Sequence, residues 1–551
     1  MGAPTMGERA SAEDADEFSV ALKGTENRQT RWAVASFVIV EIIGFVFYVL
    51  AGRRVWFHRD DWLLLASRHL SVSDLLQQYG GHWIALPLLV FRFLFWATGL
   101  RSYLPYQALT IGLHLTAAAL LRTIMRRSGV GPWIATAGAS VFVLFGSGST
   151  DILTAFQITF DAALVLGLSQ LLLADHDGPL NRRDLLGVAC GLAALMCSNV
   201  AVALVVGVGV AAFMRRGWRV AAIHTLPLGV VYAGWWVSHG RVTLLPKDKT
   251  AVLDWTRTGT AGVFNAVGQL PGVGWVLAAM LLAGFVLAWR QLDGTDRRQR
   301  FAMPLGLLVA GLVVLMSSGI ARVGIEGVSG AKASRYTHVL AAMLLPALAF
   351  AANGWVRAQR KLGLVVVALL LVGIPGNLAK TTENFPPGPF RGDKETMLSL
   401  PRMSLAPDVP RSLIPDPNQS PSVTVGWLLD GVRSGRLPPP RRPTPRELAT
   451  NTLRLSLEEL DRAASQPCTP LLRPAIRQIR PGETIGVHGT IRVQLMSQAG
   501  AGSDILTFGA TFLAGLSDHT LVDVAEPLTL RVIPVPGHFG PFVVPPKLCG
   551  A

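Results

Sequence analysis

Charged residues and cysteines are scarce in this chain of 551 residues. Only 15% of the residues are charged and four are cysteines, whereas 50% are hydrophobic and the mean hydropathy is +0.42. Such a composition is rare in a soluble globular protein of this length, so the sequence predicts a polytopic protein of the lipid bilayer. The net charge of +15 comes from basic residues spread between apolar runs, which disfavours a nucleic-acid partner.

Several catalytic signatures are absent as well. The sequence has no Walker-type phosphate loop, no zinc-protease helix and no nucleophile elbow, which disfavours nucleotide-driven and hydrolytic reactions. The first thirty residues contain no apolar core of a cleaved signal peptide. Because they are polar and mixed in charge, we expect residues 1–31 to form a disordered cytoplasmic tail.

Long apolar runs make up most of the remaining chain. A membrane helix needs about 20 mostly apolar residues, and eleven runs are candidates, some of them short. They are residues 32–51, 105–121, 132–145, 153–174, 185–196, 200–214, 220–237, 262–289, 303–320, 336–352 and 362–378. A twelfth run, residues 82–100, is ambiguous because it contains Pro87, Arg92 and several interfacial aromatic residues.

The basic residues decide how the twelfth run is interpreted. If it lies along the membrane surface, five short basic loops fall on the side of the N-terminus, as the positive-inside rule expects for the cytoplasm. Their fifteen residues are Arg122, Arg126, Arg127, Arg182, Arg183, Arg215, Arg216, Arg219, Arg290, Arg297, Arg298, Arg300, Arg357, Arg360 and Lys361. We therefore expect an α-helical polytopic membrane protein with about eleven transmembrane helices. Its transmembrane domain is residues 32–379, its first outer loop is residues 52–104, and its C-terminus is extracytoplasmic.

The C-terminal part has a different composition. Residues 380–442 are rich in Pro and predict a stem. Residues 443–551 predict a small extracytoplasmic α+β or β-rich domain, with a helix at 444–464 and strands in TIGVHGTIRVQL, DILTFGATFLAG and LTLRVIPV. Cys468 and Cys549 lie in this domain, where a disulfide between them suits an oxidising compartment. The bias toward Arg, Ala, Gly, Pro and Val is typical of high-GC bacteria, which indicates a bacterial plasma membrane.

Two adjacent acids, Asp60 and Asp61, follow the first apolar run in the stretch FHRDDW. Two carboxylates at a membrane-water boundary are costly unless they bind or react with something, so this pair is the first candidate for the catalytic residues. His58 stands beside them as a possible site-lining residue. The surrounding aromatic and basic residues are typical of a segment in the lipid headgroup layer.

Later expected outer loops add further polar groups. Asp151, at a helix start in GSGSTD, is either a simple cap or a second carboxylate of the site. The loop ARVGIEGVSGAKASRYTHVL holds cations and hydroxyls that suit a phosphate, or a lipid headgroup. These candidates are Arg322, Lys332, Arg335, Tyr336 and His338. Inside expected spans, Asp161 is equally a functional or a structural residue, and we expect His114 and His224 to be hydrogen-bonded packing residues.

Together the expected outer face offers carboxylates that can take a proton from a hydroxyl and cations that can hold a phosphate leaving group. These two kinds of side chain suit the transfer of a sugar from a lipid-linked phosphate donor. At these residues the sequence resembles the GT-C superfamily of integral-membrane glycosyltransferases, including protein-mannosyltransferase-like and arabinosyltransferase-like members. The resemblance rests on the Asp60–Asp61 pair, the segment GGHWIALPLLVFRFLFWATGL, Asp151, and SRYTHVL near the last spans.

The resemblance implies a donor such as undecaprenyl- or decaprenyl-phosphate sugar, inversion at the anomeric carbon, and an envelope glycan, lipid or protein as acceptor. Asp60 or Asp61 would be the general base, Asp151 would orient the acceptor or tune charge, and His82 could line the entry. Some members bind a divalent metal such as Mg or Mn, but this sequence shows no separate cluster of metal ligands. It also lacks a WWD-type acceptor motif, which leaves the sugar and the acceptor open.

Two other classes of protein fit parts of this pattern. A polytopic transporter or a lipid or polysaccharide flippase would also carry charges in helices and basic cytoplasmic loops, although we find no clear internal repeat. A non-catalytic envelope assembly protein would use its external domain to bind envelope polymer. In such a protein, replacement of Asp60 and Asp61 by Asn would leave function intact.

Overall fold

The structure, a computed structural model, describes residues 6–549 apart from 242–248, 386–388, 418, 441, 457, 461–467, 480–483, 497–501, 504, 509–510, 516–527, 536 and 540–541. The chain divides into two compact units. The first, which we call the helical unit, comprises Met1–Arg53, Leu75–Pro87 and Gln107–Pro386. The second, which we call the sheet unit, comprises Arg54–Asp74, Leu88–Tyr106 and Pro387–Ala551.

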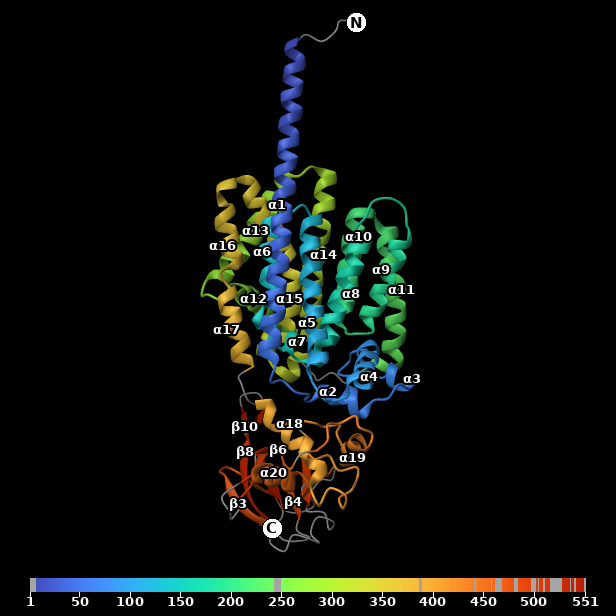
Figure 1. The fold of residues 1–551 in the computed structure, drawn as a ribbon, viewed down its shortest axis with the longest axis vertical. Helices are drawn as coiled ribbons and strands as arrows, with labels where there is room; N and C mark the ends of the chain where they lie inside the picture. Colours follow the sequence, from blue (N-terminus) through green and yellow to red (C-terminus); the bar gives the residue numbers. More distant parts are fainter. Residues whose placement is uncertain are drawn as a thin grey trace. The chain divides into compact units, whose positions relative to one another are not determined.

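The helical unit is a bundle whose helices run along one another (Figure 1). Its α-helices are α1 (Met6–Gly52), α5 (Leu104–Arg127), α6 (Pro132–Val143), α7 (Ser149–Leu153), α8 (Ile158–Ala174), α9 (Arg182–Leu195), α10 (Val200–Arg216), α11 (Trp218–Trp235), α12 (Lys249–Gly268), α13 (Val273–Gln291), α14 (Gly294–Glu326), α15 (Ser334–Ala358), α16 (Gly363–Leu371) and α17 (Ile374–Asn384). Short helical turns lie between several of them, namely η2 (Gly146–Gly148), η3 (Ala155–Gln157), η4 (Trp236–Gly240), η5 (Val328–Lys332) and η6 (Arg360–Leu362).

Nine helical segments within the described part of the chain are long and apolar enough to cross a membrane. Each coincides with one of the eleven runs expected from the sequence. The other two runs, residues 185–196 and 200–214, form α9 and α10, which have 14 and 17 residues. A full span needs about 20 residues, so both helices are shorter than a full span. The chain is therefore a polytopic helical membrane protein, and the expected count of eleven stays a prediction.

The ambiguous twelfth run forms α4 (Ala85–Thr98), whose 14 residues are too few for a span, which agrees with the interpretation that this run does not cross the membrane. Two other segments differ in detail from expectation. The run 262–289 is two helices, α12 and α13, because Gln269 and Gly272 adopt φ of 57° and 81°, which a right-handed helix cannot continue. Helix α1 begins at Met6 and so includes most of the expected disordered tail, whose stretch ERASAEDADE is rich in the helix formers Ala and Glu.

Helix α15 forms the centre of the bundle. Every residue from Tyr336 to Gly354 is buried. The stretch AAMLLPALAFAANG is apolar on all sides and rich in Ala, which is the pattern of a helix surrounded by other helices. Elsewhere small residues allow close contact. A Cβ atom on Gly207 of α10 would come within 2.5 Å of the Gly306 carbonyl oxygen on α14, and the reverse also holds.

The basic loops gather at one end of the helical unit, which we call the arginine end. Arg357 donates a hydrogen bond to the carbonyl oxygen of Gly129 at 3.0 Å. Arg127 and Arg215 both form ion pairs with Asp175, at 3.8 and 2.7 Å. The common location agrees with the positive-inside argument, since these loops were expected on one side of the membrane.

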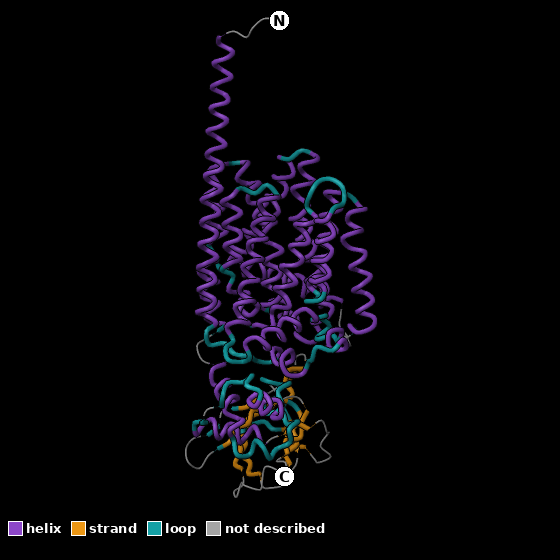
Figure 2. Tube along the Cα trace, turned by 45° about the vertical axis from the view of Figure 1, so that its right-hand side comes forward, coloured by secondary structure: helices purple, strands orange, loops and turns teal. Residues whose placement is uncertain are grey.

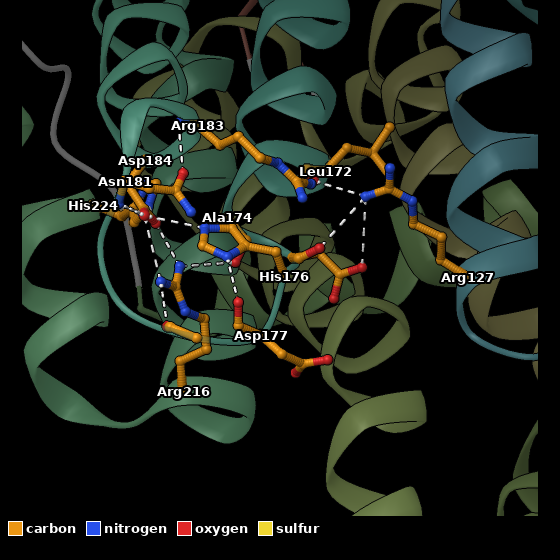
Figure 3. A network of polar contacts seen from close by, with 12 residues as sticks. Arg127, Leu172, Ala174, His176, Asp177, Asn181, Arg183, Asp184, Arg216 and His224 are labelled. Atoms are coloured by element: carbon orange, nitrogen blue, oxygen red, sulfur yellow. Dashed lines mark hydrogen bonds and ion pairs between the residues drawn. The ribbon is translucent and has the colours of Figure 1, made fainter.

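Asp184 is the centre of the polar network at the arginine end (Figure 3). Its carboxylate pairs with Arg216 and lies 3.1 Å from the ring nitrogens of both His176 and His224. It also accepts the Asn181 N–H and so closes a capping box at the start of α9. Burial raises the pKa of Asp184, but the hydrogen bonds from Arg216, Asn181 and His224 outweigh burial, and the net pKa lies below its usual range.

The sheet unit contains α2 (Asp60–Trp62), α18 (Pro389–Ser399), α19 (Val425–Arg433) and α20 (Pro445–Ser456), the turns η1 (Leu63–Ser67) and η7 (Leu400–Arg402), and most of α4; α3 (Val72–Leu76) crosses its boundary. All described strands belong to it (Figure 2). They are β1 (Glu458–Leu460), β2 (Cys468–Pro470), β3 (Ala475–Ile479), β4 (Thr484–His488), β5 (Thr490–Leu495), β6 (Leu506–Phe508), β7 (Thr511–Gly515), β8 (Leu528–Val535), β9 (Gly537–Phe539), β10 (Phe542–Val544) and β11 (Lys547–Cys549).

The strands form three antiparallel sheets. Their orders are β1-β7-β4-β11-β2, β3-β8-β5-β6 and β10-β9. Alternation of apolar and polar residues explains β5, in which Ile491, Val493 and Leu495 are buried together with Leu453 of α20. Cys468 is disulfide-bonded, and the β2–β11 register places Cys468 opposite Cys549.

The first prediction concerns Asp184. We expect Asp184→Asn to lower the free energy of unfolding by about 3 kcal/mol or more, because the buried Arg216 would lose its counter-charge. Thermal unfolding of the purified protein in detergent measures the loss. Because the folded-state pKa of Asp184 is lowered, the difference from wild type is full above about pH 4 and shrinks as the pH falls further. Asp293→Asn, at an exposed acid, is the control, and an equal loss in both variants would contradict the prediction.

Candidate functional site

Residues 79–82 form a tight turn in the helical unit. The Tyr79 N–H donates to the His82 carbonyl oxygen at 3.0 Å, and the His82 N–H donates to the Tyr79 carbonyl oxygen at 2.9 Å. Between them Gly80 and Gly81 have φ of 56° and 84°. A two-residue hairpin loop of type I′ requires positive φ at both positions, which glycine adopts without strain. The Gly-Gly pair therefore fixes the position of His82.

The polar break between α9 and α10 holds this turn. The Asn199 backbone N–H donates to Nδ1 of His82 at 3.2 Å, and the Asn199 side chain donates to the Gly81 carbonyl oxygen at 2.7 Å. Burial, together with the positive charges of Arg322 and Arg335, lowers the pKa of His82 to about 4. His82 is therefore neutral at neutral pH. Because Nδ1 accepts a hydrogen bond, the ring proton is on Nε2.

Two arginines lie at the same end of the helical unit as this turn. Arg322, on α14, donates to the Gly80 carbonyl oxygen at 3.0 Å, and it has no acidic partner among the residues that the structure describes. Arg335, on α15, pairs with Glu326 at 2.6 Å and lies 4.8 Å from the centre of the Tyr336 ring. Both arginines are partly exposed. The sequence candidates Arg322, Arg335, Tyr336 and His82 thus come together in one cluster, which we call the cation cluster.

An apolar cavity of about 410 Å³ lies among α12, α13, α14 and α15. Leu315 and Leu340 line it. On α14, Leu315 precedes Arg322 by about two turns, and on α15, Leu340 follows Tyr336 by about one turn. The cavity therefore begins one to two helical turns from the cation cluster, and its volume falls in the range of roughly 300–1,000 Å³ that is usual for ligand pockets.

Other candidates lie elsewhere in the helical unit. Lys332 is exposed on η5. Asp151 and His338 are fully buried, and no described residue forms a hydrogen bond with either carboxylate oxygen of Asp151. Asp151 therefore does not cap α7. Asp161 and His114, which the sequence left as structural or ambiguous, are buried next to them.

The acidic pair belongs to the sheet unit. Asp61 is fully buried, and its carboxylate accepts the His58 N–H at 3.1 Å and the Tyr103 hydroxyl at 3.3 Å. The rings of Tyr103 and Phe57 pack against each other, with centres 4.8 Å apart. Asp60 is partly exposed. Burial lowers the pKa of the neighbouring His58, so this imidazole is neutral at neutral pH.

Sequence reasoning missed two residues of the cation cluster. Glu326 neutralises Arg335, and Asn199 anchors the turn of His82. The sequence did contain a signal for Glu326, since this acid lies nine residues before Arg335 in the stretch expected to form one outer loop. The signal for Asn199 was the polar break itself, which can persist in a membrane only where other groups satisfy it.

Within the described ranges no group of three or more His, Cys, Asp or Glu side chains could hold a metal ion. We therefore assign no step of a reaction to a divalent cation.

Comparisons with protein-family models, with curated proteins and with solved structures found no match to this chain.

The second prediction compares the contributions of the two adjacent acids, Asp60 and Asp61, to stability. We expect Asp61→Asn to lower the free energy of unfolding by about 1–3 kcal/mol, because a buried acceptor of the Tyr103 hydroxyl is altered. Asp60→Asn, at a partly exposed position, should change it by less than about 0.5 kcal/mol. Tyr103→Phe should cost about 1 kcal/mol alone and less in the Asp61→Asn background. Additive losses in the double variant would show that the two side chains do not interact.

Proposed function

We propose that this protein is a membrane glycosyltransferase that transfers a sugar from a polyprenyl-phosphate donor to a hydroxyl group of a cell-envelope glycan, lipid or protein. One observation carries the proposal, namely that the two arginines of the cation cluster are on α14 and α15, two of the four helices that line the apolar cavity. The cavity begins one to two turns away from them. A lipid phosphate has two matching parts, an anionic head and an apolar tail.

The cation cluster suits the phosphate for three reasons. A guanidinium group is always charged and binds phosphate oxygens through paired N–H groups. The side chain of Arg322 is held by the Gly80 carbonyl oxygen and has no described acidic partner to compete with a ligand. The Nε2–H of neutral His82 adds a donor without adding charge.

In the proposed reaction the acceptor oxygen forms a bond to the anomeric carbon while the bond from that carbon to the phosphate oxygen breaks, with inversion. The lipid phosphate leaves with the electron pair of the broken bond and is stabilised by the arginines. The acceptor proton passes to a carboxylate. We assign this base to Asp60, because Asp60 is partly exposed whereas Asp61 is buried. General-base help of this kind contributes about 10²–10⁴ in rate.

The proposed orientation follows from the arginine end. This end faces the cytoplasm by the positive-inside rule, so that the cation cluster faces the extracytoplasmic side of a bacterial plasma membrane. The loop that carries Asp60 follows α1 and would lie on that side as well.

The third prediction is a transfer assay with the purified protein in lipid nanodiscs and a panel of polyprenyl-phosphate sugars. Asp60→Asn should lower kcat by about 10²–10⁴ with little change in the KM for the donor. Arg322→Gln should raise the donor KM about tenfold or more, because a charge-assisted hydrogen bond to phosphate is worth about 1.5–3 kcal/mol. Arg219→Gln, an exposed arginine of the arginine end, is the matched control and should behave as wild type.

The same assay tests the role of Glu326, the partner of Arg335. Glu326→Gln releases Arg335 from its ion pair and should lower the donor KM or leave it unchanged, whereas Arg335→Gln combined with Glu326→Gln should raise it. Wild-type kinetics in both Asp60→Asn and Arg322→Gln would sink the assignment of the site.

A specific observation favours a second candidate function, a proton-coupled transporter or flippase. Four ionisable side chains lie buried together inside the bundle, where such groups commonly mark a proton or ion pathway. Reconstituted vesicles distinguish the two functions: a transporter moves its substrate or protons across the bilayer without any acceptor, whereas the proposed transferase forms a glycosidic product.

A further inference from the structure

Four helices each contribute one ionisable side chain to a buried cluster, which we call the His–Asp cluster. It comprises His114 of α5, Asp151 of α7, Asp161 of α8 and His338 of α15, and each residue is fully buried. The proposed transfer reaction uses none of them. Gly148 makes room for the cluster, since a Cβ there would lie 2.6 Å from the His338 ring.

The neighbouring hydrogen-bond donors and acceptors determine which ring nitrogens of His114 and His338 carry protons. Nε2 of His114 lies 3.2 Å from the Val143 carbonyl oxygen, which only accepts, so Nε2 carries a proton. Nδ1 of a neutral His114 then accepts, and Nε2 of His338 donates to it at 3.0 Å. If His338 were neutral, its Nδ1 would present a lone pair to the two carboxylates.

That lone pair would meet oxygens on both sides. Nδ1 of His338 lies 3.3 Å from Asp151 Oδ2 and 3.5 Å from Asp161 Oδ1. None of the four carboxylate oxygens forms a hydrogen bond with any residue that the structure describes, and neither does Nδ1. Two anions and a lone pair in such contact repel one another, and no solvent screens them. Protons must therefore lie between these groups.

The surroundings favour a cluster without net charge. The rings of Phe142 and Tyr48 enclose the imidazoles, with centres 4.9 Å from His338 and 5.7 Å from His114. Arg335 acts electrostatically on Asp151, but Glu326 already neutralises it. Other titratable groups on these and adjoining helices include Tyr48 and the half-buried Glu41 on α1, Tyr336 on α15 and the exposed Lys380–Glu383 pair on α17. An isolated charge in this interior costs several kcal/mol.

We propose that the His–Asp cluster is a proton-binding site, in which His338 is an imidazolium ion-paired with Asp151 and Asp161 carries a second proton. The nearer contact of Nδ1, that with Asp151, is the ion pair, and Asp161 cannot be a second anion beside it. The His114–Val143 hydrogen bond fixes which nitrogen of His338 faces the acids. The site thus holds an exchangeable proton where α7, α8 and α15 meet, and this property is independent of the transferase function.

The test compares two isosteric variants by thermal unfolding at neutral pH. Asp161→Asn replaces a neutral acid by a neutral amide and should leave the melting temperature close to wild type. Asp151→Asn removes the partner of a buried imidazolium and should lower it by several degrees. Equal destabilisation by both variants would overturn the proposal, because it would show that Asp161 is ionised.

Infrared spectroscopy of the folded protein tests the proton directly. In a Glu41→Gln background, which removes a half-buried acid of helix α1, we expect a carbonyl band of a protonated carboxylic acid at neutral pH. The band should shift on ¹³C labelling of aspartate, disappear in Asp161→Asn and persist in Asp254→Asn, a control at an exposed acid. A wild-type protein without the band, or a band that survives in Asp161→Asn, would contradict the proposal.

Discussion

The low dielectric of the membrane interior is the constraint on which the rest of this structure depends. A charge inside the bundle costs several kcal/mol unless a partner neutralises it, so polar groups gather where partners exist. At the arginine end, Asp175 and Asp184 hold Arg127, Arg215 and Arg216. At the other end, Glu326 holds Arg335, and the Gly80 carbonyl oxygen holds Arg322. Between these ends stands the His–Asp cluster, in which protons take the place of counter-ions.

Most helices of the helical unit can be predicted from the sequence, because a run of about 20 apolar residues is stable in a bilayer as a transmembrane helix. The break between α12 and α13 was not predicted, because Gln269, whose φ is positive, lies inside an apolar run that resembles one continuous helix. The strands β4 to β8 follow from alternation and turn residues, as in the buried Ile491, Val493 and Leu495 of β5. Helix α20 begins at Pro445, next to the expected start at 444, and ends at Ser456, eight residues before the expected end at 464.

The residues of the candidate site could be predicted from the sequence, but which of them lie close together could be predicted only in part. Arg322 near the end of α14 and Arg335 and Tyr336 at the start of α15 are close in sequence, so their proximity follows from the chain itself. The contact of Arg322 with the turn of His82 joins residues more than two hundred positions apart, which no local pattern encodes. The same holds for His114 and His338, whose contact depends on the packing of α5 against α15. Asp61 was expected to be available for chemistry, yet it is fully buried and accepts a hydrogen bond from the Tyr103 hydroxyl.

The proposed donor binding is tested most directly by photo-crosslinking with a polyprenyl phosphate that carries a photoreactive group in its isoprenoid tail. We expect labelled peptides from α12, α13, α14 and α15, with the labelling displaced by unlabelled lipid phosphate, weakened in Arg322→Gln and little affected by the corresponding lipid alcohol. Labelling spread over all helices, or equal competition by the alcohol, would contradict recognition of a lipid phosphate by the cation cluster and its cavity.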